Sequence, residues 1–156
     1  MKWHEAVAVA ARAHGRQRDR SDVYELAHAV QVASAVGKDA TDEELAAAVL
    51  HDVIEDTDWT AEDLSTAGVP PVVVEAVEHL TRIEEPEKET YRAFIDRTAA
   101  AEGEAGRIAR RIKLADLVTN MERIRTLPEA EGMRQKRYLP ALETIRRAMQ
   151  ERGELD

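Results

Sequence analysis

Apolar positions along this chain are dominated by alanine and follow helical spacing, with almost no alternating pattern that would predict a strand. Val72-Val73-Val74 is the one β-branched triplet. It follows Pro70-Pro71, a placement typical of a helix start rather than of a strand between turns. The pattern therefore predicts an all-α protein of about seven or eight helices.

Turn and capping residues set the expected helix boundaries. Thr41 to Glu44 is a capping box that begins a helix carrying apolar residues up to Leu50, and Gly37 ends the helix before it. Pro128 separates the last two helices, and Pro140 is expected to kink the final one. The expected helices run from Trp3 to about His14, Tyr24 to Gly37, Thr41 into His51, Thr60 to near Gly68, from Pro70-Pro71 onward, Tyr91 to Ala101 with Gly103 and Gly106 closing it, near Arg107 to Arg125, and then toward Gly153.

Composition narrows the class. The 156 residues correspond to one domain, residues 1–156, and the absence of cysteine excludes a disulfide framework, thiolate zinc ligands and a cysteine nucleophile. The balance of 22 basic against 31 acidic residues, a net charge of −9, argues against duplex nucleic acid as a partner. A small anionic ligand would therefore need a local basic pocket or a metal.

Membrane and export signals are not evident in the sequence. No apolar run approaches the about 20 residues of a bilayer span, and the first five residues lack the apolar core of a secretory signal. We therefore expect a soluble cytoplasmic protein without a membrane partner. The oligomeric state stays open.

The stretch from His51 to Thr57 concentrates ionisable groups. If a helix continues through it, steps of about 100° per residue place its histidine and acids within an arc of about 140°. The residues on that arc are His51, Asp52, Glu55 and Asp56. Such crowding is costly unless a cation, water or protons compensate, and a divalent ion does so most simply. The alternative is an exposed acidic helix end.

A second polar group lies on the predicted helix near Arg107 to Arg125. Lys113 and Asn120 fall within about 60° of Asp116 around the helix axis, beside a broad apolar face. An ordinary amphipathic helix explains this pattern equally well. However, asparagine lowers helix propensity, and an acid flanked by lysine and asparagine at one-turn spacing is consistent with a metal ligand beside a phosphate site.

His28 stands on an earlier predicted helix, where a lone histidine is usually a core residue. The order His28, His51-Asp52 and Asp116 is nevertheless similar to the H…HD…D arrangement of the HD-domain metal-dependent phosphohydrolase superfamily. The surrounding sequence resembles the hydrolase domain of the Rel/SpoT alarmone enzymes and their stand-alone small relatives over about residues 13–125. The matching sequence segments are Ala13-His14 with Gln17, His28-Ala29-Val30-Gln31-Val32-Ala33, Leu50 to Thr57, and Lys113-Leu114-Ala115-Asp116-Leu117 with Asn120-Met121.

The resemblance implies an HD-type helical bundle and one divalent ion with four ligands: His28, His51, Asp52 and Asp116. Two imidazoles and two carboxylates suit Mn²⁺, the expected metal, as well as Fe²⁺, Zn²⁺ or another divalent ion. Glu55 and Asp56 match the family's catalytic acid pair, Glu55 acting on a water and Asp56 positioning it or relaying its proton. The implied reaction is hydrolysis of guanosine tetra- or pentaphosphate, (p)ppGpp, at the phosphorus on the ribose 3′ oxygen, which releases pyrophosphate.

The substrate side departs from the family. Asp19 occupies the position of the family's nucleobase-stacking arginine, flanked by Arg18 and Arg20, and Arg123 replaces a threonine. We expect the nucleotide to contact Arg18, Arg20, Lys113 and Asn120. The alternatives are an HD phosphohydrolase acting on another nucleotide or phosphorylated cofactor, and a non-catalytic nucleotide or metal sensor.

Overall fold

Helices make up nearly all of the regular structure in the computed structural model, which describes residues 1–155. The elements are α1 (Trp3–His14), α2 (Glu25–Val36), α3 (Asp42–Leu50), α4 (Val53–Asp56), α5 (Ala61–Thr66), α6 (Pro71–His79), α7 (Tyr91–Ala100), α8 (Gly103–Arg123), α9 (Ala130–Met133), the π-helical turn η1 (Arg134–Tyr138) and α10 (Leu139–Glu151). Eight of the α-helices have six residues or more, which confirms the all-α prediction. Residue 156, the end of the predicted domain, lies outside the described residues.

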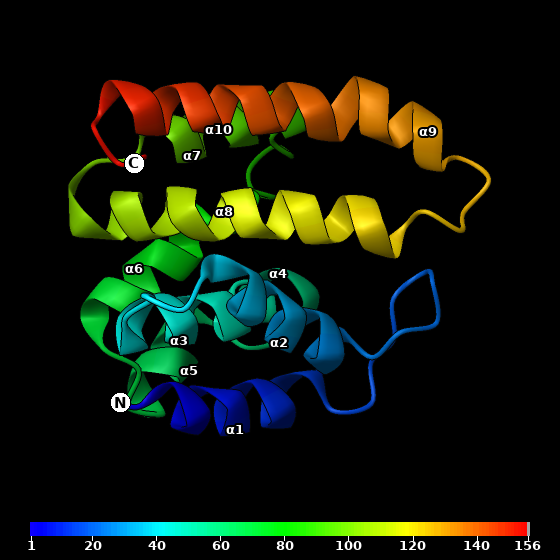
Figure 1. Ribbon diagram of the computed structural model, residues 1–156. Coiled ribbons are helices and arrows are strands. Elements are labelled where there is room, and N and C mark those ends of the chain that lie inside the picture. The colour runs from blue at the N-terminus through cyan, green and yellow to red at the C-terminus, as the bar shows by residue number, and fades with distance from the viewer. Residues whose placement is uncertain (156) are drawn as a thin grey trace.

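Helix α8 runs through the middle of the molecule between two hydrophobic cores (Figure 1). Ile108 and Ile112 of α8 belong to the larger core, which α1, α2, α3, α5 and α6 complete. Leu117 of the same helix belongs to the smaller core with α7 and α10. A polar group on α8 near the boundary of the two cores can therefore meet both layers.

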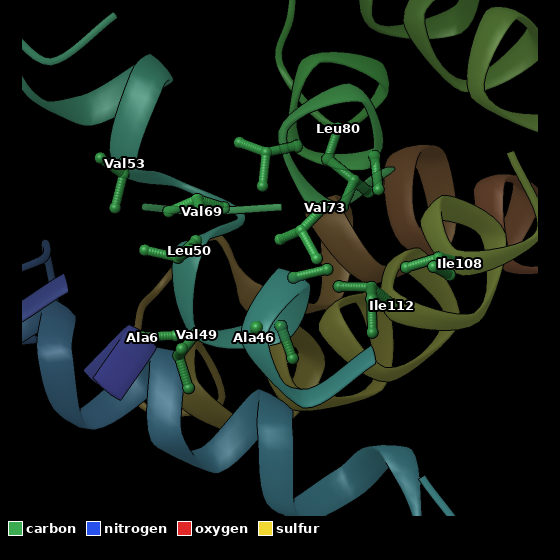
Figure 2. Packing of buried hydrophobic residues seen from close by; sticks show 14 of the residues in the cluster. Ala6, Ala46, Val49, Leu50, Val53, Val69, Val73, Leu80, Ile108 and Ile112 are labelled. Carbon is green, nitrogen blue, oxygen red and sulfur yellow. The ribbon is translucent and has the colours of Figure 1, made fainter. Parts of the chain in front are cut away.

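Helix α3 is the most deeply buried element of the larger core. Its residues 46–50 are at most 1% exposed, and residues of α1, α6 and α8 gather around them (Figure 2). The predicted capping box is present: the Thr41 hydroxyl accepts from Glu44 N, and the Glu44 carboxylate accepts from Thr41 N at 2.9 Å. Capping fixes the start of α3 and burial fixes its orientation. The position of His51 and Asp52, which directly follow α3, is therefore fixed as well.

The boundary between α7 and α8 differs from the prediction. Helix α8 begins at Gly103, four residues before the expected start, and Gly106 lies inside it instead of ending the preceding helix. A Cβ atom at position 106 would lie 2.2 Å from the carbonyl oxygen of Ala101. Gly106 therefore permits the close approach of the α7–α8 connection to the first turn of α8, a role that glycine serves besides helix termination.

The irregularity expected near Pro140 is present as the π-helical turn η1, directly before α10. Pro140 itself lies in the first turn of α10, and because the helical backbone continues from η1 into α10, its missing N–H removes a hydrogen bond at this junction. None of the helices within residues 1–155 combines the length and apolar character needed to cross a bilayer.

Candidate metal centre and adjoining cavity

Three parts of the chain bring the predicted ligands together. His28 lies on α2, His51 and Asp52 follow α3, and Asp116 lies on α8. Asp116 Oδ1 is 3.2 Å from His28 Nε2 and 3.3 Å from His51 Nε2. Asp52 Oδ2 is 3.1 Å from His51 Nε2 and 4.0 Å from His28 Nε2. His28, His51 and Asp116 form a fully buried group whose candidate donor atoms lie within 4.8 Å of one another, and Asp52 lies beside both imidazoles.

The helix does not continue through the His51 to Asp56 stretch as the sequence analysis assumed. Helix α3 ends at Leu50, His51 and Asp52 form a turn, and α4 starts at Val53. Asp52 has φ −102° and ψ 0°, a backbone conformation found in turns and at active sites. His51 is buried, while Asp52, Glu55 and Asp56 still line one cavity.

The donor atoms fit a divalent cation. His51 Nδ1 lies 2.7 Å from the Ala48 carbonyl oxygen, which only accepts, so Nδ1 carries a proton and Nε2, which faces the two carboxylates, is the atom left to bind a cation. His51 Nε2 is buried without a hydrogen-bond partner. A backbone carbonyl that fixes the tautomer of a histidine is the usual support of a metal-ligating imidazole.

Asp116 is held in place by two neighbours on its own helix. Lys113 Nζ donates to Asp116 Oδ2 at 2.9 Å, and Asn120 Nδ2 donates to Asp116 Oδ1 at 3.0 Å. Lys113 also lies 4.8 Å from the ring centroid of Phe94. Lys113 and Asn120 were predicted to contact substrate; both line the cavity wall, and both donate a hydrogen bond to the candidate ligand Asp116.

Burial and charge oppose each other at this centre. Burial alone would lower the pKa of His51, but the charges of Asp52 and Asp116 outweigh it and hold that pKa well above its usual range. Burial would raise the pKa of Asp52, yet His51 lowers it to about 2. The pKa of Asp116 is also well below its usual range, because Lys113 and His51 overcome the effect of burial. Both carboxylates are therefore ionised at neutral pH, and a cation held between them would compensate their charge.

Glu55 and Asp56 lie beside the centre with different supports. Glu55 Oε1 accepts a hydrogen bond of 2.9 Å from the backbone N–H of Arg82, and burial raises the pKa of Glu55 although this bond opposes the rise. Burial, followed by the charges of Asp52, Glu25 and Glu55, raises the pKa of Asp56 to about 8. The raised pKa of Asp56 favours its protonated form near neutral pH.

Glu25 is an additional acid that sequence reasoning missed. It offers an oxygen within 4.8 Å of oxygens of Asp52 and Asp56, and its Oε2 is buried without a hydrogen-bond partner. Glu25 precedes His28 by three residues, so both lie on one face of α2. That spacing is the signal by which Glu25 could have been found.

A cavity of about 420 Å³ opens beside the centre. All four residues expected to contact substrate line it, together with Glu55 and Asp56. Its lining also includes residues that were not predicted as functional, namely Arg82, Tyr91, Phe94, Arg123, Arg137 and Tyr138. Six basic side chains in the wall of one cavity, in a chain of net charge −9, provide the local basic pocket that an anionic ligand requires.

The loop between α1 and α2 is ordered by its own contacts. The Arg18 guanidinium lies 4.0 Å from the Tyr24 ring centroid and donates to the Asp22 carbonyl at 2.9 Å. Arg20 forms an ion pair with Glu129. Both arginines reach the cavity wall, although each already has a protein partner.

Asp19 and Arg123, the two charged departures from the family pattern, contact each other. Asp19 accepts hydrogen bonds from the backbone N–H groups of Ser21 and Val23 and, at 3.1 Å, from Arg123. The serine hydroxyl donates to the Arg123 carbonyl at 3.0 Å, which fastens the loop to the end of α8. Because Asp19 and Arg123 carry opposite charges and both differ from the family pattern, their contact could have been predicted from the sequence.

Comparisons with known proteins identify a family and a similar fold. The HD domain family model matches residues 6–144. A solved structure described as a metazoan ortholog of SpoT that hydrolyses ppGpp and plays a role in starvation responses is similar in fold, with a TM-score of 0.71 and 24% sequence identity. The match covers 98% of this chain and 96% of that chain. No curated protein matches significantly. Because the family model spans most of the chain and the histidine-aspartate centre lies within it, the protein belongs to the HD domain family.

Proposed function

We propose that the protein is a metal-dependent phosphohydrolase that removes the 3′ diphosphate of guanosine tetra- or pentaphosphate. The observation that carries the proposal is the convergence of His28, His51 and Asp116 on one buried point at the edge of a cavity with six basic residues. The similar fold of a protein described as hydrolysing ppGpp supports the choice of nucleotide.

The four ligands of the proposed ion are His28, His51, Asp52 and Asp116, and Mn²⁺ is the expected metal. A bound divalent ion lowers the pKa of water and neutralises charge on the phosphoryl oxygens. Lys113 and Asn120 keep Asp116 in the orientation that the site needs, since both donate to its carboxylate.

Glu55 is the proposed proton acceptor. The Arg82 backbone N–H holds Oε1 of Glu55, which leaves the other carboxylate oxygen to take a proton from the attacking water. Burial raises the pKa of Glu55, which makes its carboxylate a stronger base than that of a fully solvated glutamate.

Asp56 is the proposed proton donor. With a pKa raised to about 8, it carries a proton near neutral pH. As the oxygen of water bonds to phosphorus, the bond from phosphorus to the ribose 3′ oxygen breaks. That oxygen takes the proton of Asp56, and the products are pyrophosphate and a nucleotide with a free 3′ hydroxyl.

A nucleotide panel tests the proposal. The panel holds guanosine tetraphosphate, other phosphorylated nucleosides and dinucleotide cofactors, each assayed with Mn²⁺ and with chelator. The expected result is pyrophosphate release from guanosine tetraphosphate only when Mn²⁺ is present. Turnover that persists in chelator would contradict the metal-dependent mechanism, and binding without any turnover would favour the sensor alternative.

One observation favours a second candidate, hydrolysis of a different phosphorylated nucleotide or cofactor. Arg18 lies on Tyr24, and Asp19 is bound to Arg123, so the loop that carries the family's base-stacking arginine is occupied with internal contacts. In the same panel, this candidate predicts turnover of another nucleotide in preference to guanosine tetraphosphate, with orthophosphate as the product when the scissile group is a monoester.

A further inference from the structure

The basic residues of the cavity fall into two groups. Within residues 1–155, four of the six form ion pairs with carboxylates: Arg18 with Asp22, Arg20 with Glu129, Lys113 with Asp116, and Arg123 with Asp19 and Glu25. Arg82 and Arg137 form no ion pair among the described residues. Their charges are the least compensated of the cavity wall.

Contacts place both guanidinium groups at the start of α7. Arg82 Nε donates to the Glu89 carbonyl oxygen at 2.6 Å. The Glu89 carboxylate is engaged by Arg97, through bonds of 2.9 and 3.0 Å, so it does not neutralise Arg82 by direct contact. Tyr91 is the first residue of α7, and the Arg137 guanidinium lies 4.3 Å from its ring centroid.

The π-helical turn η1 accounts for the position of Arg137. This turn includes Arg137 and Tyr138, and both side chains line the cavity. Tyr138 is buried and belongs to the smaller core, so η1 is anchored while Arg137 stays partly exposed. Single π-helical turns of this kind occur frequently at functional sites.

Neither arginine is engaged with the metal ligands. Arg137 stacks on Tyr91, Arg82 binds the loop before α7, and the contacts of Asp116 are made by Lys113 and Asn120 instead. A guanidinium offers a planar set of N–H donors that matches two phosphate oxygens at once. The stacking of Arg137 on Tyr91 and the single Nε hydrogen bond of Arg82 leave other N–H groups of each guanidinium free, so both arginines can bind an anion.

We propose that Arg82 and Arg137 form a phosphate-binding subsite at the α7 end of the cavity, and that it takes a phosphate group of the substrate other than the one hydrolysed. The inference rests on the proposed function for the nature of the ligand, a nucleotide phosphorylated at two places. The subsite selects for the second phosphorylated position, whereas the metal centre acts on the first.

Equilibrium binding tests the subsite without depending on turnover. Titration calorimetry with guanosine 5′-diphosphate and with guanosine is done on the wild type, Arg137→Gln and Arg82→Gln in the presence of Mn²⁺. Each substitution is expected to weaken binding of the diphosphate about 10-fold or more and to leave binding of guanosine unchanged, because only the phosphate contacts are lost. Arg82→Lys keeps the charge and should recover part of the affinity.

Two matched controls remove a charge from the same segments. Lys136→Gln changes an exposed residue of η1, and Lys88→Gln changes an exposed residue of the loop that precedes α7. Both should bind the diphosphate as the wild type does. If they weaken it as much as Arg137→Gln, general electrostatic attraction explains the effect and the subsite is refuted.

The remaining outcomes separate this inference from the proposed function. Equal weakening of guanosine and its diphosphate would assign the arginines to the nucleoside and overturn the subsite. Binding of inorganic phosphate that Arg137→Gln abolishes, with nucleotide affinity unchanged, would make it a site for free phosphate and also overturn the inference. If guanosine tetraphosphate is not hydrolysed but the arginine effect holds, the proposed reaction fails while the subsite stands.

Discussion

The two halves of α8 hold buried acids in opposite ways. In the first half, Arg107 and Arg111 both bind Glu44 of α3, whose side chain is 1% exposed. The Thr41 backbone completes the hydrogen bonding of Glu44, and no Glu44 oxygen is left unpartnered. In the second half, Asp116 also meets the end of α3, but the groups around it include buried atoms without partners: His28 Nδ1, His51 Nε2 and Asn120 Oδ1.

This difference indicates that Glu44 serves the stability of the fold, whereas Asp116 and Asp52 are arranged to bind a ligand. Buried charges are tolerated when they are paired and fully hydrogen-bonded, as Glu44 is. Around Asp116 two carboxylates share a pair of imidazoles, and Lys113 is the basic side chain that pairs with Asp116. The same helix therefore has one end suited to stability and one suited to binding a cation.

The largest effect is expected from Asp52→Ala. It removes a proposed ligand whose Oδ2 lies 3.1 Å from His51 Nε2, so Mn²⁺ binding should be lost and kcat/KM should fall about 10³-fold or more. Metal content by mass spectrometry and turnover of the active nucleotide measure the two losses together. Activity that survives in the metal-free variant would contradict the role of the whole centre. Asp58→Asn, an exposed acid nearby, is the control and should keep both metal and activity.

Glu44→Gln should act on stability instead. Breaking a buried, paired charge is expected to cost about 3 kcal/mol in free energy of unfolding, while turnover stays unchanged because Glu44 does not line the cavity. Urea unfolding at neutral pH measures this cost. The exposed neighbour Glu43→Gln is the control and should shift the free energy by less than about 0.5 kcal/mol.

The contribution of Glu44 also predicts a pH dependence. Burial would raise the pKa of Glu44, but bonds from Thr41 and Arg107 and the charge of Arg111 lower it below the ordinary 4.5. A carboxyl group with a lowered pKa stabilises the folded state above its unfolded value, and this is lost as pH falls toward the folded value. The difference between wild type and Glu44→Gln should therefore shrink below about pH 4.5. A constant difference down to pH 3 would show that packing, not charge, explains it.

Glu55→Gln comes next in expected size. The amide keeps the shape of the side chain but cannot take a proton, so turnover should fall about 10²-fold while Mn²⁺ remains bound. Single-turnover kinetics together with metal content measure both quantities. If Mn²⁺ is lost as well, Glu55 supports the metal centre itself and the separation between ligands and proton acceptor is wrong.

Local patterns in the sequence explain why most of the fold could be predicted. Capping by Thr41 and Glu44, the helix end at Gly37 and the proline pair at the start of α6 act over a few residues, so their effect can be predicted without the rest of the chain. The start of α8 could not be read in this way. Gly106 is required by the approach of Ala101, a contact that depends on how two helices meet.

The residues of the candidate site also fall into two groups: those that a local sequence pattern predicts and those whose position depends on tertiary packing. The four candidate metal ligands could be predicted because their order and the neighbouring sequence segments resemble a known pattern. The structure brings all four together: His28, His51, Asp52 and Asp116. Arg82, Tyr91 and Arg137 were not predicted as functional, because their positions in the cavity follow from the packing of α7 and η1. The assumed continuous helix at residues 51–56 was wrong, yet the turn there directs Asp52, Glu55 and Asp56 to the same cavity.

Asn120→Ala gives the smallest expected effect and decides between two roles for that residue. Sequence analysis assigned Asn120 to the substrate, whereas in the structure its amide donates to Asp116 Oδ1 at 3.0 Å. Loss of an outer hydrogen bond to a metal ligand should weaken Mn²⁺ binding about 10-fold with KM little changed. Titration of the metal-free protein with Mn²⁺ measures the affinity, and Thr119→Ala, which removes only a bond to the Ala115 carbonyl of the same helix, is the control. Unchanged Mn²⁺ affinity with a raised KM would instead place Asn120 on the nucleotide, and the second half of α8 would then bind substrate as well as metal.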